Sequence, residues 1–154
     1  MKITFKGDYA IKSLLFLARK YEDDESGFFQ IAEISRNQDI PLKFLEQIFL
    51  LLRKAGYLKS HRGTRGGFAL NRPPRSIRLG EIIRLIDGPL SPIACVSQSA
   101  YQACAFESRC VLRPLWAEVN RSVSALLDPI TFSDLVKRER DLLDSQAGQA
   151  MYHI

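Results

Sequence analysis

The 154-residue sequence predicts a mainly α-helical fold that carries one small β-hairpin. Apolar residues recur at helical spacing in most segments, and two strand-length segments flank a single glycine-rich turn. Proline and glycine separate the helical segments from one another. With 46% hydrophobic residues, the chain can bury one core, or a small domain with an oligomerisation arm, but not two large domains.

The first three predicted helices lie in the N-terminal half. The first covers residues 5–21, where an apolar stripe alternates with cations, and a short second helix is expected over residues 30–37. A third helix follows Pro41, since proline is tolerated in a first turn, and it ends at Gly56. Two short helices joined by a tight turn, the second longer and basic, form the helix-turn-helix pattern.

A β-hairpin is predicted directly after these helices. The strand-length segments 57–61 and 68–70 flank residues 62–67, which are rich in glycine and arginine. This glycine-rich turn lacks the Lys-Ser/Thr ending of a phosphate-binding P-loop. A hairpin in this place is a wing, so residues 1–75 are predicted to form a winged helix-turn-helix domain.

The second half begins with a short predicted helix over residues 79–87, which Gly88 and Pro89 end. Residues 90–109 show little periodicity and are expected to form a loop. A strong helical stripe returns over Val111–Leu127. Along the sequence, one long loop therefore separates the first predicted helix of this half from the helices that follow.

A last short helix is predicted from a capping box at Thr131 and Asp134 through Leu142. Residues 76–144 are thus expected to form a second region, made of the loop and its helices. Residues 145–154 have little to bury, so we expect a disordered tail.

Charge is unevenly distributed along the chain. Residues 1–75 carry 14 lysines and arginines against 8 acidic residues, whereas residues 76–154 carry 8 against 9. Between residues 43 and 75, Glu46 is the one acidic residue among eight cations. This density suits a polyanion, either nucleic acid or an anionic membrane surface, and the helix-turn-helix pattern favours nucleic acid.

The third helix and the wing supply the candidate DNA contacts. Polar residues of this helix fall away from its apolar stripe, so they can reach bases and phosphates while the stripe is buried. A lone glutamate can accept a hydrogen bond from cytosine N4, although an intramolecular ion pair is the alternative. For single lysines the alternative is a merely solvated charge. The candidates are Lys43, Glu46, Gln47, Lys54, Lys59, Arg62 and Arg65.

No stretch approaches the roughly 20 apolar residues of a membrane-spanning helix, and the first residues lack the pattern of a secretion signal. We therefore expect a cytoplasmic protein without a membrane partner. No convergent nucleophile, base and oxyanion donors can be assembled from the sequence, so an enzyme is not expected.

Three cysteines, Cys95, Cys104 and Cys110, lie on the predicted loop, with eight and five residues between them. In a reducing compartment, such a cluster indicates a metal site or redox centre rather than a disulfide framework. Thiolates are strong ligands for the iron of iron–sulfur clusters, and a flexible loop can bring three of them together. Zinc, a metal-free thiol sensor and three merely buried cysteines are the alternatives.

Several segments together resemble the Rrf-two family of bacterial transcription regulators, the family of IscR, NsrR, RirA and CymR. They are ITFKGDYAIKSLLFLA, IPLKFLEQIFLLLRKAGYLKSHRGTRGGFAL, LGEIIRLIDGP, the three cysteines and PITFSDLV, which cover nearly all of residues 2–137. The resemblance implies a homodimer that binds a roughly palindromic operator in double-stranded DNA, with a long dimerisation helix at Val111–Leu127. It also implies that Glu46 and Arg62 contact bases.

Family members with the three cysteines bind an iron–sulfur cluster, so the resemblance implies such a cofactor here, with a 4Fe–4S form favoured over 2Fe–2S. Some members supply a histidine three residues after the last cysteine. This sequence has Arg113 there, which cannot ligate iron. Asp8 of the partner subunit is the preferred fourth ligand, because some members present a carboxylate at this place. Glu107 or a small thiol is the alternative, and Asp8 is otherwise an exposed acid at a helix start.

The leading hypothesis is a transcription regulator, of the repressor kind, whose operator affinity is switched by the cluster. The signal is iron, iron–sulfur status, oxidative stress or nitric oxide. The alternative hypothesis is a metal-free, thiol-responsive regulator or protein-interaction module of the CymR kind.

Overall fold

A computed structural model describes residues 2–63 and 66–151, with only the backbone described for residues 147–151. It confirms the mainly helical fold with an antiparallel two-stranded hairpin. Within the described residues the helices and strands are α1 (Phe5–Asp23), α2 (Ile31–Gln38), α3 (Leu42–Lys54), β1 (Leu58–His61), β2 (Gly67–Leu70), α4 (Leu79–Asp87), α5 (Arg113–Leu127) and α6 (Phe132–Met151). Short 3-10 turns add η1 (Pro74–Ser76), η2 (Ala94–Val96) and η3 (Glu107–Arg109).

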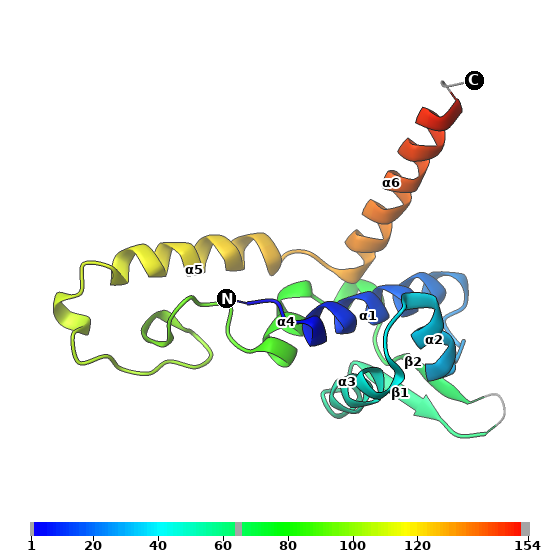
Figure 1. Cartoon of the computed structure of the whole chain (residues 1–154), viewed down its shortest axis with the longest axis horizontal. Helices are drawn as coiled ribbons and strands as arrows, with labels where there is room; N and C mark the ends of the chain where they lie inside the picture. The colour runs from blue at the N-terminus through cyan, green and yellow to red at the C-terminus, as the bar shows by residue number, and fades with distance from the viewer. Residues whose placement is uncertain (1, 64–65, 152–154) are drawn as a thin grey trace.

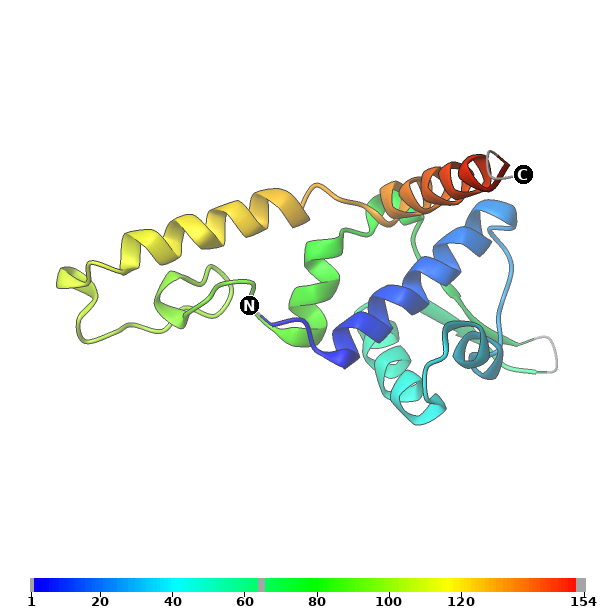
Figure 2. The ribbon, with the colours of Figure 1, turned by 45° about the horizontal axis from the view of Figure 1, so that its top comes forward.

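The molecule consists of a body and an arm (Figures 1 and 2). The body contains α1 to α4, the hairpin and the start of α6. The arm contains residues 88–112, which we call the cysteine loop, and α5, which runs alongside this loop. The C-terminal part of α6 extends beyond the body (Figure 1).

The core of the body forms where the apolar stripes of α1 and α3 meet. On α3, Leu45, Ile48, Phe49 and Leu52 recur at three- and four-residue spacing and are completely buried. The sequence predicted this stripe, since helical periodicity places such residues on one face. The other fully buried large side chains include Leu14, Ile34, Ile77, Ile82, Phe132 and Val136.

The hairpin pairs Leu58 with Leu70 at its base and His61 with Gly67 near its tip. Phe29 adds a short bridge to Phe68, with backbone N–H to oxygen distances of 3.0 and 2.9 Å. Gly67 has a φ of +152°, and a Cβ there would overlap the backbone of Phe29. Glycine is therefore required where the wing passes the segment before α2.

Two sets of contacts fix the base of α5 to the body. Arg84 of α4 forms a two-pronged ion pair with Asp128, with nitrogen–oxygen distances of 2.6 and 3.0 Å, and donates to the Ser124 hydroxyl at 3.2 Å. Arg78 and Thr131 form an isolated antiparallel bridge next to it. The arm is thus held at its α5 end by backbone and side-chain contacts.

Several helix boundaries differ from the sequence prediction by one or two residues, and the end of α6 differs by more. Helix α5 begins at Arg113 rather than at Val111, because Pro114 occupies its first turn, where its missing N–H is not needed. The predicted capping box is present, since the Asp134 amide donates to Thr131 Oγ1 at 3.1 Å. However, α6 runs to Met151 rather than ending near Leu142, so it includes residues 145–151 of the expected tail.

The continuation of α6 has a local cause. Its last turns contain alanine, glutamine and methionine, which favour helix, together with one glycine and no proline. Residues 141–146 are exposed, so the helix continues there on its backbone hydrogen bonds, which a prediction based on burial overlooks. Residues 152–154 lie outside the described part of the chain. None of the helices in the described residues has the length and apolarity needed to cross a membrane.

Candidate nucleic-acid interface and cysteine loop

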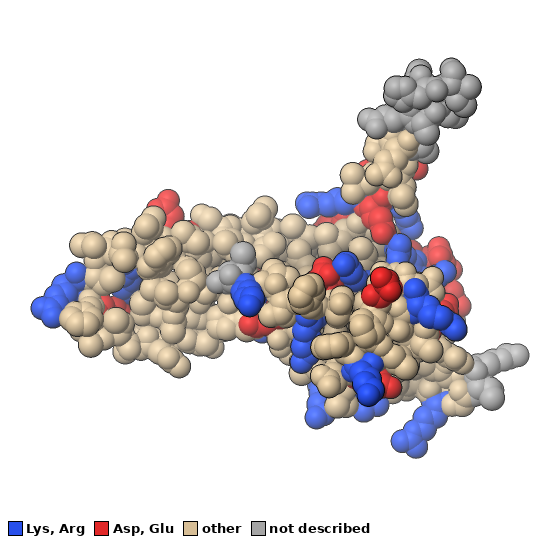
Figure 3. All heavy atoms as spheres, viewed as in Figure 1, with Lys and Arg blue, Asp and Glu red and all other residues tan. Residues whose placement is uncertain are grey.

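The outer face of α3 carries exposed polar side chains, as its pattern predicted. Lys43, Glu46, Gln47 and Lys54 are all exposed, while the opposite face of the helix is buried in the core. Figure 3 shows lysine and arginine side chains along the lower edge of the molecule, where α3 and the hairpin lie. This edge therefore brings lysine and arginine side chains of the hairpin beside the exposed face of α3.

The wing lies beside this face and is joined to it. Arg53, in the last turn of α3, donates from Nη1 to the Ser60 hydroxyl of β1 at 3.2 Å. Lys59 and Arg62 are exposed on the wing, and the Lys59 Nζ stands 5.6 Å from the centre of the Phe28 ring. Arg65, the remaining wing candidate, lies outside the described residues.

Sequence reasoning counted Arg53 among the cations but assigned it no role. Its contact with Ser60 joins two elements whose relative position the sequence does not give, so only the fold reveals it. The contact adds to the packing of the Phe49 ring on Phe68, which joins α3 to the wing. It therefore positions the two candidate DNA-reading elements relative to each other.

A depression of about 360 Å³ opens on this face, between α2, α3 and β2. Glu46 borders it and forms no ion pair with any described residue. Among the described residues, the intramolecular ion pair that was the alternative for Glu46 is therefore not present, and no described cation occupies its carboxylate. The lining residues are Ile31, Glu46, Leu50, Arg53 and Phe68.

The three cysteines are free thiols with different surroundings. Cys95 is buried in η2, Cys104 is exposed, and Cys110 is half-buried just before α5. The buried Asn120 of α5 donates from Nδ2 to the Val96 carbonyl at 3.1 Å, which fixes η2 against the middle of α5. One thiol is thus held against the helix while another faces solvent.

This arrangement does not form a ready metal site. Within the described part of the chain, no three histidine, cysteine, aspartate or glutamate side chains lie close enough together to hold a metal ion. The donor set suits iron chemically, because three free thiols share one loop. The loop geometry does not suit it as it stands, so binding a cluster requires the loop to rearrange.

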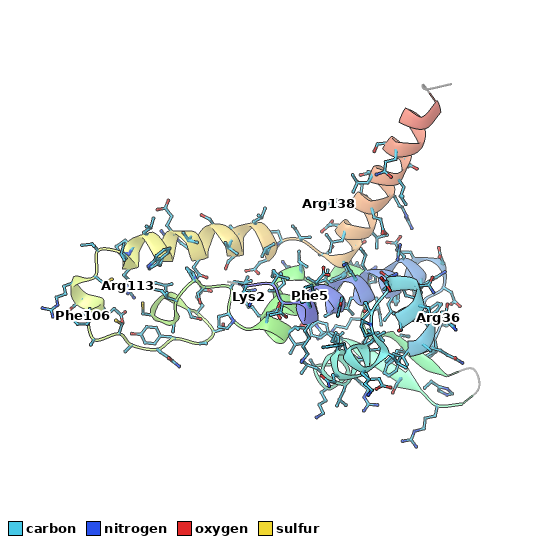
Figure 4. All side chains as sticks on the ribbon, in the orientation of Figure 1. Lys2, Phe5, Arg36, Phe106, Arg113 and Arg138 are labelled. Carbon is cyan, nitrogen blue, oxygen red and sulfur yellow. The ribbon has the colours of Figure 1, made fainter. Side chains whose placement is uncertain are left out.

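Glu107 is engaged on both carboxylate oxygens. Tyr101 donates its hydroxyl to Oε2 at 2.8 Å, and Arg113 Nη2 lies 2.8 Å from Oε1. The Tyr101 hydrogen bond is the main cause that lowers the pKa of Glu107 below its ordinary value, and a backbone amide and Arg113 add to it. Figure 4 shows Arg113 at the start of α5, next to the cysteine loop. In this state Glu107 clamps the loop to α5.

Asp8 lies in the first turn of α1 and pairs with Lys12 across one turn, at 2.6 Å. Hydrogen bonding to Asp8 raises the pKa of Lys12. Beside Asp8 is a depression of about 410 Å³ that residues 2–5 also line, and Phe5 there is 81% exposed. Figure 4 shows Lys2 and Phe5 at this start of α1, near the junction of body and arm.

The start of α1 is joined to the root of the cysteine loop. The Thr4 backbone N–H donates to Asp87 Oδ2 at 3.1 Å, and the Thr4 hydroxyl donates to Oδ1 at 2.5 Å. Asp87 is the last residue of α4, and the cysteine loop begins at the next residue. Any displacement of this root therefore acts directly on α1, which packs on α3.

Helix α5 leaves an apolar stripe uncovered on its outer side. Val111 just before the helix and Leu126 near its end are 88% and 67% exposed, and Leu115 and Val119 lie between them. Leu115, Val119 and Leu126 share one face of α5, whereas Asn120, which contacts η2 of the cysteine loop, lies on another face. No described residue of the chain covers this stripe.

Comparisons with known proteins agree with one another. The profile of the Rrf2 family, described as an iron-dependent transcriptional regulator, matches residues 3–138. An rrf2-like HTH-type transcriptional regulator of Rhodobacter capsulatus is 42% identical over 137 residues, which cover 87% of this chain and 91% of that protein.

Two solved structures resemble the fold over most of its length. CymR, the global cysteine regulator of B. subtilis, has a TM-score of 0.75 and 31% identity, covering 90% of this chain and 98% of CymR. T. potens IscR has a TM-score of 0.70 and 32% identity, covering 90% of this chain and 88% of that chain.

Proposed function

The chain belongs to the Rrf2 family of transcriptional regulators, and from this membership we propose that it is a homodimeric repressor whose operator affinity depends on the state of the cysteine loop. It is a DNA-binding regulator of the winged-helix type and not an enzyme. The observation that carries the proposal is the exposed polar face of α3, which the wing flanks.

The candidate DNA contacts divide by their chemistry. Glu46 is a free acceptor on the helix, suited to the amino group of cytosine or adenine in the major groove. Arg62 lies at the start of the wing tip, where a guanidinium reaches bases or the minor groove. Lys43, Lys54 and Lys59 are point charges for phosphates, and Gln47 adds a polar donor and acceptor.

The partner that fits the apolar stripe of α5 is a second copy of the chain. An exposed stripe of valine and leucine along one helix is costly in water and is well suited to pairing with an identical stripe. A two-fold axis through this stripe gives the dimer two reading surfaces. Two-fold symmetry in the protein requires a roughly palindromic operator.

For the sensing step we propose that Cys95, Cys104 and Cys110 hold an iron–sulfur cluster, with the 4Fe–4S form favoured. The three free thiols on one loop and the iron-dependent description of the family support this proposal. Such a cluster supplies a redox-active inorganic core that is sensitive to iron supply, oxidants and nitric oxide. Asp8 of the partner subunit is the proposed fourth ligand, because some members of the family present a carboxylate at this place. Asp8 would have to leave Lys12 to bind iron, just as Glu107 would have to leave Tyr101 and Arg113.

The residues at the root of the cysteine loop couple the conformation of the loop to the affinity for DNA. Asp87 holds the first turn of α1 through Thr4, and α1 packs against α3. When the loop gathers its thiols, Asp87 is displaced together with the segment that follows it. The position of α3 relative to the wing then changes, and with it the affinity for DNA.

The test is anaerobic purification with iron reconstitution, followed by visible absorption and by binding to a duplex selected from a random library. We expect a coloured protein whose affinity for the duplex changes when the cluster is removed. Cys104→Ala should lose both the colour and this change, while Ser99→Ala, an exposed residue of the same loop, should keep both. A reconstituted protein that stays colourless contradicts the proposal of an iron–sulfur cluster. A protein that selects no duplex contradicts the proposal of a DNA-binding regulator.

A second candidate for the sensing step is a metal-free thiol switch. It is favoured by the absence of a gathered ligand group among the described residues and by the similarity to CymR. In this case an oxidant changes DNA affinity in protein that contains no iron. Iron analysis of the purified protein, together with binding before and after oxidation, separates the two candidates.

A further inference from the structure

An exposed leucine occupies the middle of the proposed DNA-reading face. Leu50 is 46% exposed, although it is flanked on α3 by polar residues that face outward. It lies one helical turn after Glu46 and just before Arg53, on the same side of the helix. A large apolar side chain on a surface that otherwise suits charged phosphates needs an apolar partner.

The surroundings of Leu50 form a site of defined chemistry. Leu50, Ile31 and Phe68 give the depression of about 360 Å³ an apolar wall, while Glu46 and Arg53 stand at its polar margin. The three apolar side chains come from α3, α2 and β2, so the fold alone brings them together. The Arg53–Ser60 contact holds one margin of the depression in place.

The major groove of DNA offers one apolar group that fits such a wall, the C5-methyl of thymine. Hydrogen-bonding edges of the other bases would lose their water against it without gaining a partner. We propose that Leu50, with Ile31 and Phe68, is a specificity-determining site that reads a thymine methyl in the operator. The inference rests on the proposed function and extends it to a base preference.

The helix geometry also places this thymine relative to the base that Glu46 contacts. Four residues of helix advance by about 6 Å, and neighbouring base pairs are about 3.4 Å apart. The preferred thymine therefore lies within about two base pairs of the base whose amino group donates a hydrogen bond to Glu46. The site commits each half of the operator to a thymine within that distance of the base.

The experiment uses the full-length protein and a duplex that it selects from a random library. Each thymine of one half-site is replaced in turn by deoxyuridine, which removes the methyl and changes no hydrogen-bonding group. At one of these positions, the replacement should lower the affinity about fourfold, because the apolar contact of one methyl group is lost. At the same position, 5-methylcytosine should bind more tightly than cytosine by a similar factor.

Variants attribute this effect to Leu50. Leu50→Ala should bind the thymine and deoxyuridine duplexes equally, while Leu143→Ala, an exposed leucine of α6, should keep the fourfold difference. The inference is overturned if no deoxyuridine weakens binding of the wild type, or if the difference persists in Leu50→Ala. In both results the selected duplex is still bound, so the proposed function stands. Failure to select any duplex overturns the inference together with the proposed function.

Discussion

Gly7 is the position where the structure makes the sharpest prediction about stability. Replacing a helical glycine by alanine normally stabilises a helix by up to about 1 kcal/mol. At Gly7, a Cβ would overlap Asp87 Oδ2 and come within 2.8 Å of its Cγ. The Asp87 carboxylate must therefore move away before an alanine fits.

The cost of that movement is the loss of the two hydrogen bonds that Asp87 accepts from Thr4. Hydrogen bonds to a charged group contribute about 1.5–3 kcal/mol when buried, and less here because the site is only partly buried. We take about 2 kcal/mol for the pair and subtract the helix gain of Gly7→Ala. The variant is then expected to lose about 1 kcal/mol in free energy of unfolding, which lowers Tm by about 2–4 °C for a chain of this size.

The assay is thermal and urea unfolding, followed by circular dichroism, in a double-mutant cycle with Asp87→Ala. In the Asp87→Ala background the overlap is gone, so Gly7→Ala should become stabilising by up to about 1 kcal/mol. Gly7→Ala is thus expected to lower the free energy of unfolding when the Asp87 carboxylate is present and to raise it when that carboxylate is absent. If Gly7→Ala stabilises the wild type as well, Asp87 does not hold the start of α1 and the proposed route from loop to DNA fails with it.

Three further perturbations test other contacts. Thr131→Ala removes the hydroxyl that caps α6 and should cost about 1 kcal/mol in free energy of unfolding. It should also raise the pKa of Asp134, which the Thr131 hydroxyl mainly lowers. Because that pKa is lowered on folding, the carboxylate stabilises α6 above its ordinary pKa and loses this contribution as the pH falls through the folded value. Urea unfolding should therefore show a smaller difference between the variant and the wild type in acid, where only the bond from the Asp134 amide to the Thr131 hydroxyl remains. A difference that stays constant with pH contradicts a contribution of the carboxylate. Asp128→Ala breaks the partly exposed pair with Arg84 and should cost about 1 kcal/mol at low salt and less at high salt; an equal cost at both salt concentrations contradicts an ionic contribution. Val119→Asp places a charge in the proposed dimer stripe and should give a monomer in sedimentation, while Arg121→Gln, on the flank of α5, stays dimeric; a dimeric Val119→Asp places the interface elsewhere.

Local patterns in the sequence were sufficient to predict most of the fold. The apolar stripe of α3 predicted its buried face, and the capping box at Thr131 predicted the start of α6, because both depend on residues three or four positions apart. The exposed face with Lys43, Glu46, Gln47 and Lys54 followed from the same periodicity. The end of α6 was missed because a helix can continue on backbone hydrogen bonds alone.

The sequence by itself determined a helical fold with a basic helix, a wing and three clustered cysteines, since these are properties of composition, spacing and motif. Its resemblance to the Rrf2 family indicated a regulator. Only the tertiary structure decided which side chains meet. It joined Thr4 to Asp87 and Arg53 to Ser60, and it left the three thiols apart in this state of the loop. Such contacts join residues distant along the chain, so they depend on how whole helices pack, which no local pattern records.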